Sequence, residues 1–238
     1  IEILSPLADS YVNSLTQIEL TMEDMTGYLI TDSLKFYVSK NSSFFVDTLY
    51  VPNSDLIFNS DTLTYTLSST QQAALSDKDN LSVYIEVRDN VDYGSDHYSN
   101  YSWSFSYDIS PPISVLQEPL DNTITSDSLQ KIYIVLDDES GSGINTSTIQ
   151  FTLEDSTYSI ISDNNTLMFS NDTLLTFDPS YAGLAFSDGD TINYSIDSVY
   201  DIAGNFLSNP QSAFFKVDLS SPVIEILAPQ AESYVNSL

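Results

Sequence analysis

Residues 189–209 read GDTINYSIDSVYDIAGNFLSN, and this stretch decides the fold class. Its first half alternates polar residues with apolar ones, at Ile192, Tyr194 and Ile196. Such alternation is typical of a strand with one face in a core and the other in solvent. The second half predicts a turn, because Gly204 can adopt a positive φ without steric cost and Asp201 and Asn205 can hydrogen-bond neighbouring backbone amides. We therefore expect a hairpin between the last two strands of a domain.

The same pattern occurs about 110 residues earlier in the chain. DISPP at 108–112 matches DLSSP at 218–222. Leu81, Val83 and Ile85 likewise match the alternating residues of the opening stretch. At an offset of 114, Asp24 aligns with Asp138 and Gly27 with Gly141. A unit of about 110 residues therefore occurs twice.

Short alternating runs bounded by Asp, Asn, Gly, Ser and Pro fill both copies, which favours half-buried antiparallel strands. We predict strands near 1–4, 15–23, 33–39, 44–50, 54–67, 80–88 and 100–108, and near 113–116, 129–137, 147–153, 157–161, 166–177, 190–199 and 211–218. Seven strands in such a unit indicate a β-sandwich. The predicted fold class is all-β, with two tandem immunoglobulin-like antiparallel β-sandwich domains at 1–112 and 113–223. Each has its own core, with inward-facing Ile18, Leu20, Phe36, Ile85 and Phe105, and Ile132, Ile134, Phe151, Ile196 and Phe215.

A second, longer repeat is superimposed on the first. IEILAPQAESYVNSL at 224–238 is identical at twelve of fifteen positions to IEILSPLADSYVNSL at 1–15. We therefore expect 224–238 to be the first strand of a third repeat in a longer repetitive protein. Sequence does not separate a covalent array from head-to-tail assembly by strand donation.

Composition excludes several classes of function. Six Lys and Arg against 34 Asp and Glu give a net charge of −28, which repels nucleic acid and anionic membrane surfaces. The chain has no Cys, so neither a disulfide scaffold nor a thiolate metal site can form. No apolar run approaches the roughly 18 residues of a membrane span. We expect no nucleic-acid partner and no membrane insertion.

The opening stretch, followed by a strand and VDLSSP, resembles the bacterial immunoglobulin-like domains that occur in tandem in large surface proteins and adhesins. The resemblance is carried by Tyr194, Ile196, Asp201, Ala203, Gly204, Asn205, Val217, Asp218 and Pro222. DDESGSGI at 137–144 resembles the acidic, Gly-containing turn after the second strand of such domains. The first copy departs from the pattern, since VRDNVDYGSD at 87–96 replaces the turn. The resemblance implies an extracellular or cell-surface location, with neighbouring repeats of the same protein as partners.

Strand direction predicts a calcium site at the junction between the domains. In a sandwich whose strands alternate in direction, the loops after the second and sixth strands lie where the chain enters, facing the preceding domain. The expected ligands are Asp108, Asp137, Asp138, Asp201 and Asn205, with Asp77 and Asp79 at the same end of the first domain. Ca²⁺ takes six to eight hard oxygen ligands, and such a cluster repels itself without a cation. The alternative is that these acids solvate turns or adapt the surface to salt.

Three further features bear on function. Trp103 and Tyr101 align with Ala213 and Gln211, so they either face the core or form an edge platform that stacks on a sugar ring. His97 is the only His, which excludes a His-based triad or a two-His metal site within this segment. Asn-x-Ser/Thr glycosylation sequons start at Asn41, Asn80, Asn100, Asn145, Asn164, Asn171 and Asn193.

These features predict a non-enzymatic structural module, since a duplicated unit without a distinctive polar constellation is typical of repetition for length. We expect a rigid, elongated spacer or stalk of an adhesin, surface-layer protein or filament, with nearly collinear domains. Short linkers with Pro111, Pro112 and Pro222 favour rigidity. The alternative is an adhesive module that binds a glycan or a cell-surface receptor.

Overall fold

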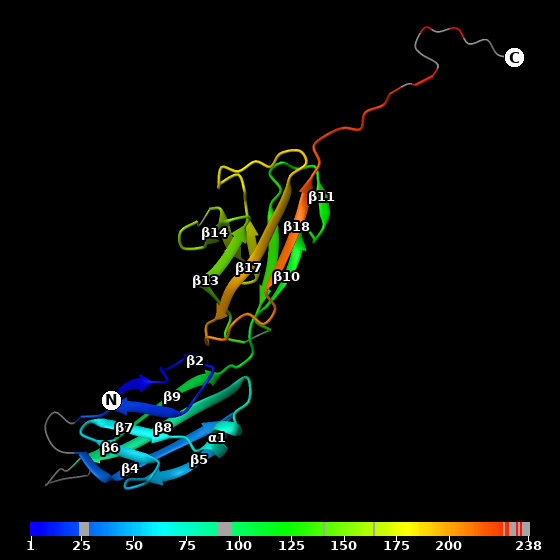
Figure 1. The fold of residues 1–238 in the computed structure, drawn as a ribbon. Helices are drawn as coiled ribbons and strands as arrows, with labels where there is room; N and C mark the ends of the chain where they lie inside the picture. The colour runs from blue at the N-terminus through cyan, green and yellow to red at the C-terminus, as the bar shows by residue number, and fades with distance from the viewer. Residues whose placement is uncertain are drawn as a thin grey trace.

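The computed structural model describes residues 1–23, 29–89, 97–139, 141–163, 165–225, 227, 228, 232 and 234. Two β-sandwiches lie end to end, and the chain leaves the second at the pole opposite the first (Figure 1). Every sheet lies wholly within 2–107 or wholly within 113–217. We call these two parts the first and the second sandwich.

The first sandwich packs a four-stranded sheet, in the order β1-β3-β7-β6, against a five-stranded sheet, in the order β2-β9-β8-β4-β5. Between β7 and β8 lies one short helix, which begins after a capping box formed by Ser68 and Gln71. The elements are β1 (Glu2–Ser5), β2 (Tyr11–Val12), β3 (Gln17–Thr21), β4 (Leu29–Lys40), β5 (Ser43–Tyr50), β6 (Leu56–Asn59), β7 (Thr62–Thr66), α1 (Ser69–Ala73), β8 (Asp79–Asp89) and β9 (Tyr98–Tyr107).

The second sandwich repeats this topology strand for strand. Its sheets have the orders β10-β12-β16-β15 and β11-β18-β17-β13-β14. The elements are β10 (Ile113–Glu118), β11 (Thr123–Thr125), β12 (Ile132–Asp137), β13 (Ile144–Leu153), β14 (Ser156–Ser159), β15 (Leu167–Ser170), β16 (Leu174–Phe177), β17 (Thr191–Asp201) and β18 (Gln211–Val217). The all-β fold of paired sheets is therefore confirmed.

Three details of the predicted sandwich were wrong. The described residues of each sandwich form nine strands rather than seven, partly because the short strands β2 and β11 were not predicted. The predicted single strands at 54–67 and 166–177 are each a hairpin of two strands, β6 with β7 and β15 with β16. The chain reverses at Ser60 in the first and at Asn171 and Asp172 in the second, all with positive φ. Apolar alternation continues across these tight turns, so it did not reveal them. Pairing is also not wholly antiparallel, because β2 pairs with β9 and β11 with β18 in parallel.

Each sandwich has its own hydrophobic core. Alternating residues face inward along the strands, as in β12, where buried and half-buried positions alternate. The ten side chains predicted to face inward are all buried, at 0% or 1% exposure. In the second core Phe151 lies at the centre, with its ring centroid 5.0 Å from that of Phe177 and 6.3 Å from that of Tyr194.

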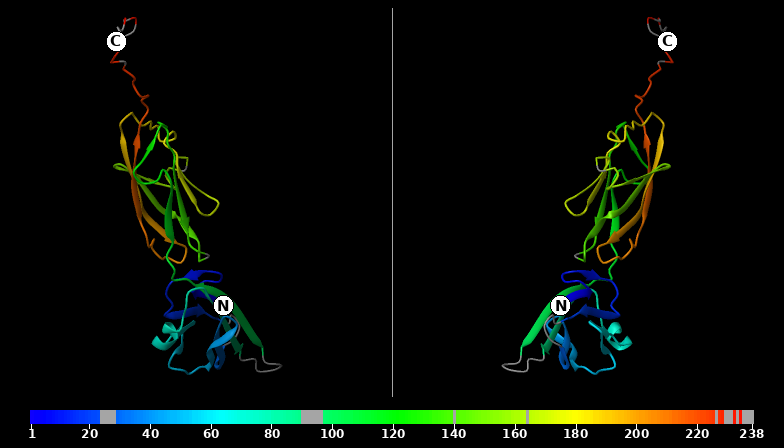
Figure 2. Two further views of the ribbon diagram at one scale, coloured as in Figure 1. Left: turned by 90° about the vertical axis from the view of Figure 1, so that its right-hand side faces the viewer. Right: turned by 90° about the vertical axis from the view of Figure 1, so that its left-hand side faces the viewer.

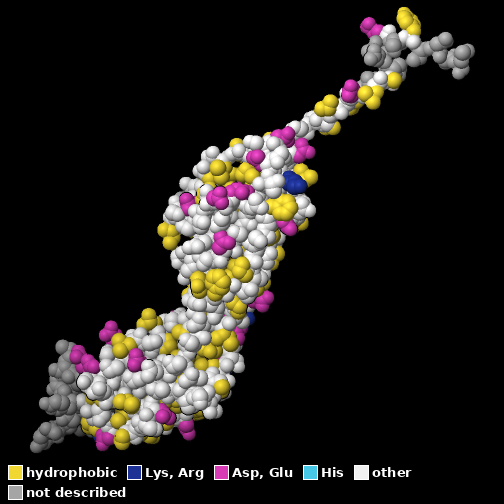
Figure 3. All heavy atoms as spheres, viewed as in Figure 1, with side chains coloured by type: hydrophobic (Ala, Val, Ile, Leu, Met, Phe, Trp, Pro, Cys, Tyr) yellow, Lys and Arg dark blue, Asp and Glu magenta, His cyan; other side chains and the backbone are white. Residues whose placement is uncertain are grey.

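The two sandwiches form an elongated pair with a narrow waist between them (Figure 3). Their long axes are inclined to each other, rather than nearly collinear as predicted (Figures 1 and 2). Most of the predicted first strand of a third repeat, at 224–238, lies outside the described residues, and the described ones there form no strand. Within the described ranges, no helix is long and apolar enough to cross a membrane.

Truncation of Phe151 tests the packing of the second core. We expect Phe151→Ala to lower the free energy of unfolding of the second sandwich by about 3–5 kcal/mol, because a fully buried ring is replaced by a cavity. Chemical denaturation followed by fluorescence or circular dichroism measures this change. Ile161→Ala is the control in the same sandwich, since Ile161 is 74% exposed. A loss below about 1 kcal/mol for Phe151→Ala would show that the side chain does not anchor this core.

Candidate metal centre at the junction

Three buried aspartates meet at the waist. Asp108 follows β9 of the first sandwich, whereas Asp138 follows β12 and Asp201 ends β17 of the second. One carboxylate oxygen from each lies within 4.8 Å of the other two. Their exposed fractions are 2%, 6% and 1%. We call these three residues the aspartate trio.

The hairpin after β17 fixes Asp201 in this position. The Asn205 amide donates to Asp201 Oδ1 at 2.7 Å, and the Asp201 amide donates to the Asn205 carbonyl at 3.1 Å. Gly204 between them has φ of 94°, a conformation that L side chains rarely adopt. The predicted positive φ of Gly204 and the predicted bond from a backbone amide to Asp201 are confirmed. The Asn205 side chain, expected to bond a neighbouring amide, instead donates to Asp201 and to the Asp108 carbonyl.

The loop between β12 and β13 wraps around the other two carboxylates. The Ser142 amide donates to Asp108 Oδ2 at 2.6 Å, and the Gly143 amide donates to Asp138 Oδ2 at 2.7 Å. Gly141 lies directly against both acids. A Cβ atom there would stand 2.6 Å from Asp138 Oδ2 and 2.9 Å from Asp108 Oδ2.

Further contacts tie the two sandwiches together around the trio. Asn205 Nδ2 donates to Asp201 Oδ2 at 2.7 Å and to the Asp108 carbonyl at 2.9 Å. Lys78 Nζ, from the first sandwich, donates to the Glu139 carbonyl of the second at 2.9 Å. Asn205 therefore positions the acids through its side-chain nitrogen, which cannot bind a metal ion.

The trio concentrates negative charge in a buried place. Asp138 Oδ1 is buried and has no hydrogen-bond partner. Burial, opposed by the Gly143 amide and reinforced by the charges of Asp108, Asp201 and Asp137, raises the pKa of Asp138 to about 6. Among the described residues, the ion pairs involve Lys35, Lys40 and Lys131, and none of these reaches the trio.

These observations fit a hard divalent cation. Carboxylate oxygens are the ligands that Ca²⁺ prefers in proteins. A buried anionic oxygen without a donor is costly unless a positive charge compensates it. Asp138 Oδ1 is such an oxygen. Asp108 and Asp201 each bring a further carboxylate oxygen within 4.8 Å, although their oxygens also accept hydrogen bonds.

The other predicted ligands make different contacts. Asp137 Oδ1 accepts a hydrogen bond from the Glu139 amide. Asp77 accepts from the Ile109 and Ser110 amides and from the Ser110 hydroxyl, and these bonds outweigh its partial burial and lower its pKa.

Asp79 is likewise occupied. It pairs with Lys40 at 3.1 Å and accepts from the Ser76 amide, so its pKa is lowered although burial opposes this. The structure therefore brings together three of the seven predicted residues, with Asn205 beside them.

The two predicted aromatic residues lie differently. Trp103 is 5% exposed, and its Nε1 donates to the Pro6 carbonyl at 3.0 Å. Tyr101 is 42% exposed, with its ring centroid 6.2 Å from that of Trp103. Trp103 thus packs in the first core, which leaves Tyr101 as the exposed ring of the pair.

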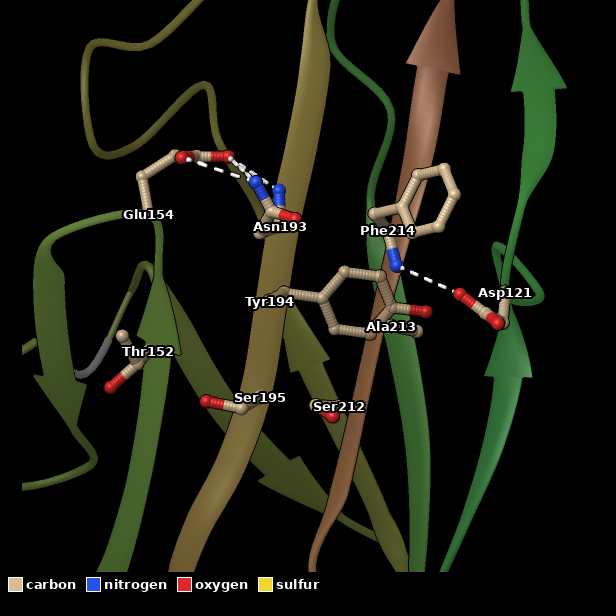
Figure 4. A pocket seen from close by; sticks show the side chains of 9 residues that line it. All are labelled: Asp121, Thr152, Glu154, Asn193, Tyr194, Ser195, Ser212, Ala213 and Phe214. Atoms are coloured by element: carbon tan, nitrogen blue, oxygen red, sulfur yellow. Dashed lines mark hydrogen bonds between the residues drawn. The ribbon is translucent and has the colours of Figure 1, made fainter.

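An open hollow of about 410 Å³ lies on the outer face of the β13-β17-β18 sheet (Figure 4). Its floor carries the hydroxyls of Thr152, Ser195 and Ser212. Its two carboxylates have donors already, since Glu154 accepts from Asn193 and Asp121 accepts from the Phe214 amide. No orphaned polar atom points to a ligand among the residues that line it, so the junction is the stronger candidate site.

The sequence matches no protein-family model and no curated protein. Solved structures that resemble the chain include murine CEACAM1b, with 14% identity, 91% of this chain and 98% of that chain covered, and a TM-score of 0.38. The FN1–FN3 domains of chicken CNTN1 are 9% identical, with 89% of this chain and 66% of that chain covered and a TM-score of 0.34. A 1.5-MDa bacterial ice-binding adhesin is 16% identical, with 86% of this chain and 58% of that chain covered and a TM-score of 0.34.

These neighbours are immunoglobulin-like or fibronectin-type all-β proteins, and the likeness is one of fold. The chain spans 58% of the adhesin chain and 66% of the CNTN1 chain that it resembles. Membership of the bacterial immunoglobulin-like family stays a prediction.

The raised pKa of Asp138 predicts how stability depends on pH in protein stripped of divalent cations. Its folded pKa of about 6 lies above the ordinary value of 3.8, so the folded state binds a proton more tightly than the unfolded state between those values. Asp138 should therefore make stability fall as the pH rises from about 4 to about 6, and it should contribute no further fall above about 7. Thermal unfolding with a chelator measures this trend. Asp138→Asn should flatten it, and an unchanged slope in that variant would contradict the assignment.

Proposed function

We propose that this chain is a non-enzymatic spacer module of an extracellular, cell-surface protein, and that calcium fixes the angle between its sandwiches. One observation carries the proposal: the trio takes one carboxylate from the first sandwich and two from the second, and one of its buried oxygens has no donor. An ion bound there would join the two bodies directly.

Calcium suits this site better than magnesium. The three carboxylates come from two loops and a strand end, an arrangement that adapts to flexible coordination. Magnesium demands near-ideal octahedral geometry and retains several waters, which a site buried to this degree accommodates poorly.

The ion would act on a joint that is already short. Five residues, 108–112, connect β9 to β10, and Pro111 and Pro112 restrict their backbone. Without a cation, the like charges of the trio oppose closure of this joint. With a cation, the same charges hold it closed, so the pair would keep a defined orientation.

The surface supports a spacer more than a ligand-binding module. The two sandwiches repeat one topology and form an elongated pair (Figure 2). The alternative of a glycan- or receptor-binding module rested on Trp103 and Tyr101, and Trp103 is largely buried. The extracellular location and the place in an array of repeats are drawn from the resemblance to tandem surface domains.

Distance measurements across the joint test the proposal. The chain has no Cys, so Ser54→Cys in the first sandwich and Ser156→Cys in the second can carry a pair of spin labels. We expect a narrow distance distribution with millimolar Ca²⁺ and a broader one with a chelator. Calorimetry should show one calcium per chain and much weaker binding of Mg²⁺.

Asp138→Asn should abolish calcium binding and leave the distribution broad in either condition. Asp137→Asn is the matched control, because its carboxylate caps the Glu139 amide outside the trio. Equal distributions with and without calcium, together with no heat of binding, would refute a cation-fixed joint.

Gly141→Ala tests the site through its shape. A methyl group there would push against the carboxylates of Asp138 and Asp108 and displace them from the ion. We expect calcium affinity to fall by about tenfold or more, which corresponds to roughly 1.4 kcal/mol. Calorimetry measures the affinity, and chemical denaturation of the calcium-free protein controls for folding. Unchanged affinity would show that the trio does not bind the ion as proposed.

A further inference from the structure

We propose that the C-terminal pole of the second sandwich is half of a second junction, which receives the N-terminal pole of another immunoglobulin-like sandwich with acidic loops. By C-terminal pole we mean the sandwich end at which its last strand finishes. The inference rests on the proposed function, because it assigns the same kind of joint to a second place. It stands on a comparison of the two C-terminal poles.

The first contact that recurs is an aspartate clamp on the linker. In the first sandwich Asp77 accepts from the Ile109 amide at 2.9 Å and from the Ser110 hydroxyl at 2.8 Å. In the second sandwich Asp188 accepts from the Leu219 amide at 2.6 Å and from the Ser220 hydroxyl at 2.5 Å. The linker after β18 is thus held in the same way as the linker after β9.

The equivalent of Asp108 is Asp218, and its own contacts recur as well. The Asp108 amide donates to the Val12 carbonyl at 3.0 Å, and the Asp218 amide donates to the Thr125 carbonyl at 2.9 Å. Each carboxylate accepts from the amide two residues later, that of Ser110 at 3.1 Å or Ser220 at 3.2 Å.

The two aspartates differ in what covers them. Asp108 is 2% exposed, because the Ser142 amide and the Asn205 side chain of the second sandwich lie over it. Asp218 is exposed. The C-terminal pole of the second sandwich therefore presents, already ordered, the surface that the first sandwich uses in its occupied junction.

One tie would be missing from the second junction. Lys78 reaches the Glu139 carbonyl across the first junction, and its own amide donates to the Tyr107 carbonyl at 2.8 Å. The equivalent residue is Gly189, whose amide donates to the Val217 carbonyl at 2.8 Å. Both have positive φ, of 65° and 83°. Without the lysine, the second joint would depend more strongly on the cation.

The occupant that this surface fits is a sandwich of the same kind as the second one. Its N-terminal pole would bring equivalents of Asp138 and Asp201 to Asp218, and equivalents of Ser142 and Asn205 to cover it. A basic protein attracted to the exposed acids alone would not need the register that the linker clamp imposes.

A chain with three sandwiches tests the inference. It consists of residues 1–222 followed directly by residues 113–223, so that the added sandwich repeats the second one. We expect two calcium ions per chain by calorimetry, against one in the original chain. Asp218→Asn in the second sandwich should reduce the number of bound ions to one. Asp197→Asn in the same sandwich, on the exposed face of β17, should leave two.

Spin labels on the second and third sandwiches give an independent readout. A distance distribution that is narrow with calcium, and that Asp218→Asn broadens, supports the second junction. A broad distribution, or a single ion whose binding Asp218→Asn does not affect, overturns it. Calcium binding to the original chain separates the two proposals, since its loss would refute the cation at the first joint whatever the third sandwich does.

Discussion

The carboxylate of Asp108 is the point on which the arrangement of this molecule depends. Asp108 follows the last strand of one sandwich, and its carboxylate lies buried among the loops of the next, so its burial requires both sandwiches in fixed positions. A buried carboxylate is stable only when donors or a cation compensate its charge. The loops of the second sandwich are shaped to that need, with an amide from Ser142 and a glycine at 141 that leaves room for the acid.

That constraint explains why two loops distant in sequence are built differently from ordinary turns. The hairpin around Gly204 directs Asp201 inward, and Asn205 uses its one side-chain nitrogen on both Asp201 and the Asp108 carbonyl. The turn is thus a structural hairpin and part of the junction at once. A fold that needed only to close the hairpin would not need the acid there, since many residues satisfy such turns.

The sequence predicted the fold well because its determinants are local and periodic. Alternation along 192–196 and its counterpart at 81–85 placed the core, and Phe151 and Phe215 are fully buried as expected. Turns were harder to predict, because the alternating pattern continues through Ser60. For the site, strand direction correctly brought Asp138 and Asp201 to Asp108, but could not show that Asp79 is occupied by Lys40, a contact set by tertiary packing.

The inclination between the two sandwiches has a consequence for any longer array of this pair. When a joint with a fixed bend and twist recurs, successive units wind into a superhelix instead of a straight rod. The contour length of such an array exceeds its end-to-end distance. Under tension the array can therefore lengthen by straightening at its joints while every hydrophobic core stays intact. An array of this kind would extend gradually under an applied force before any sandwich began to unfold.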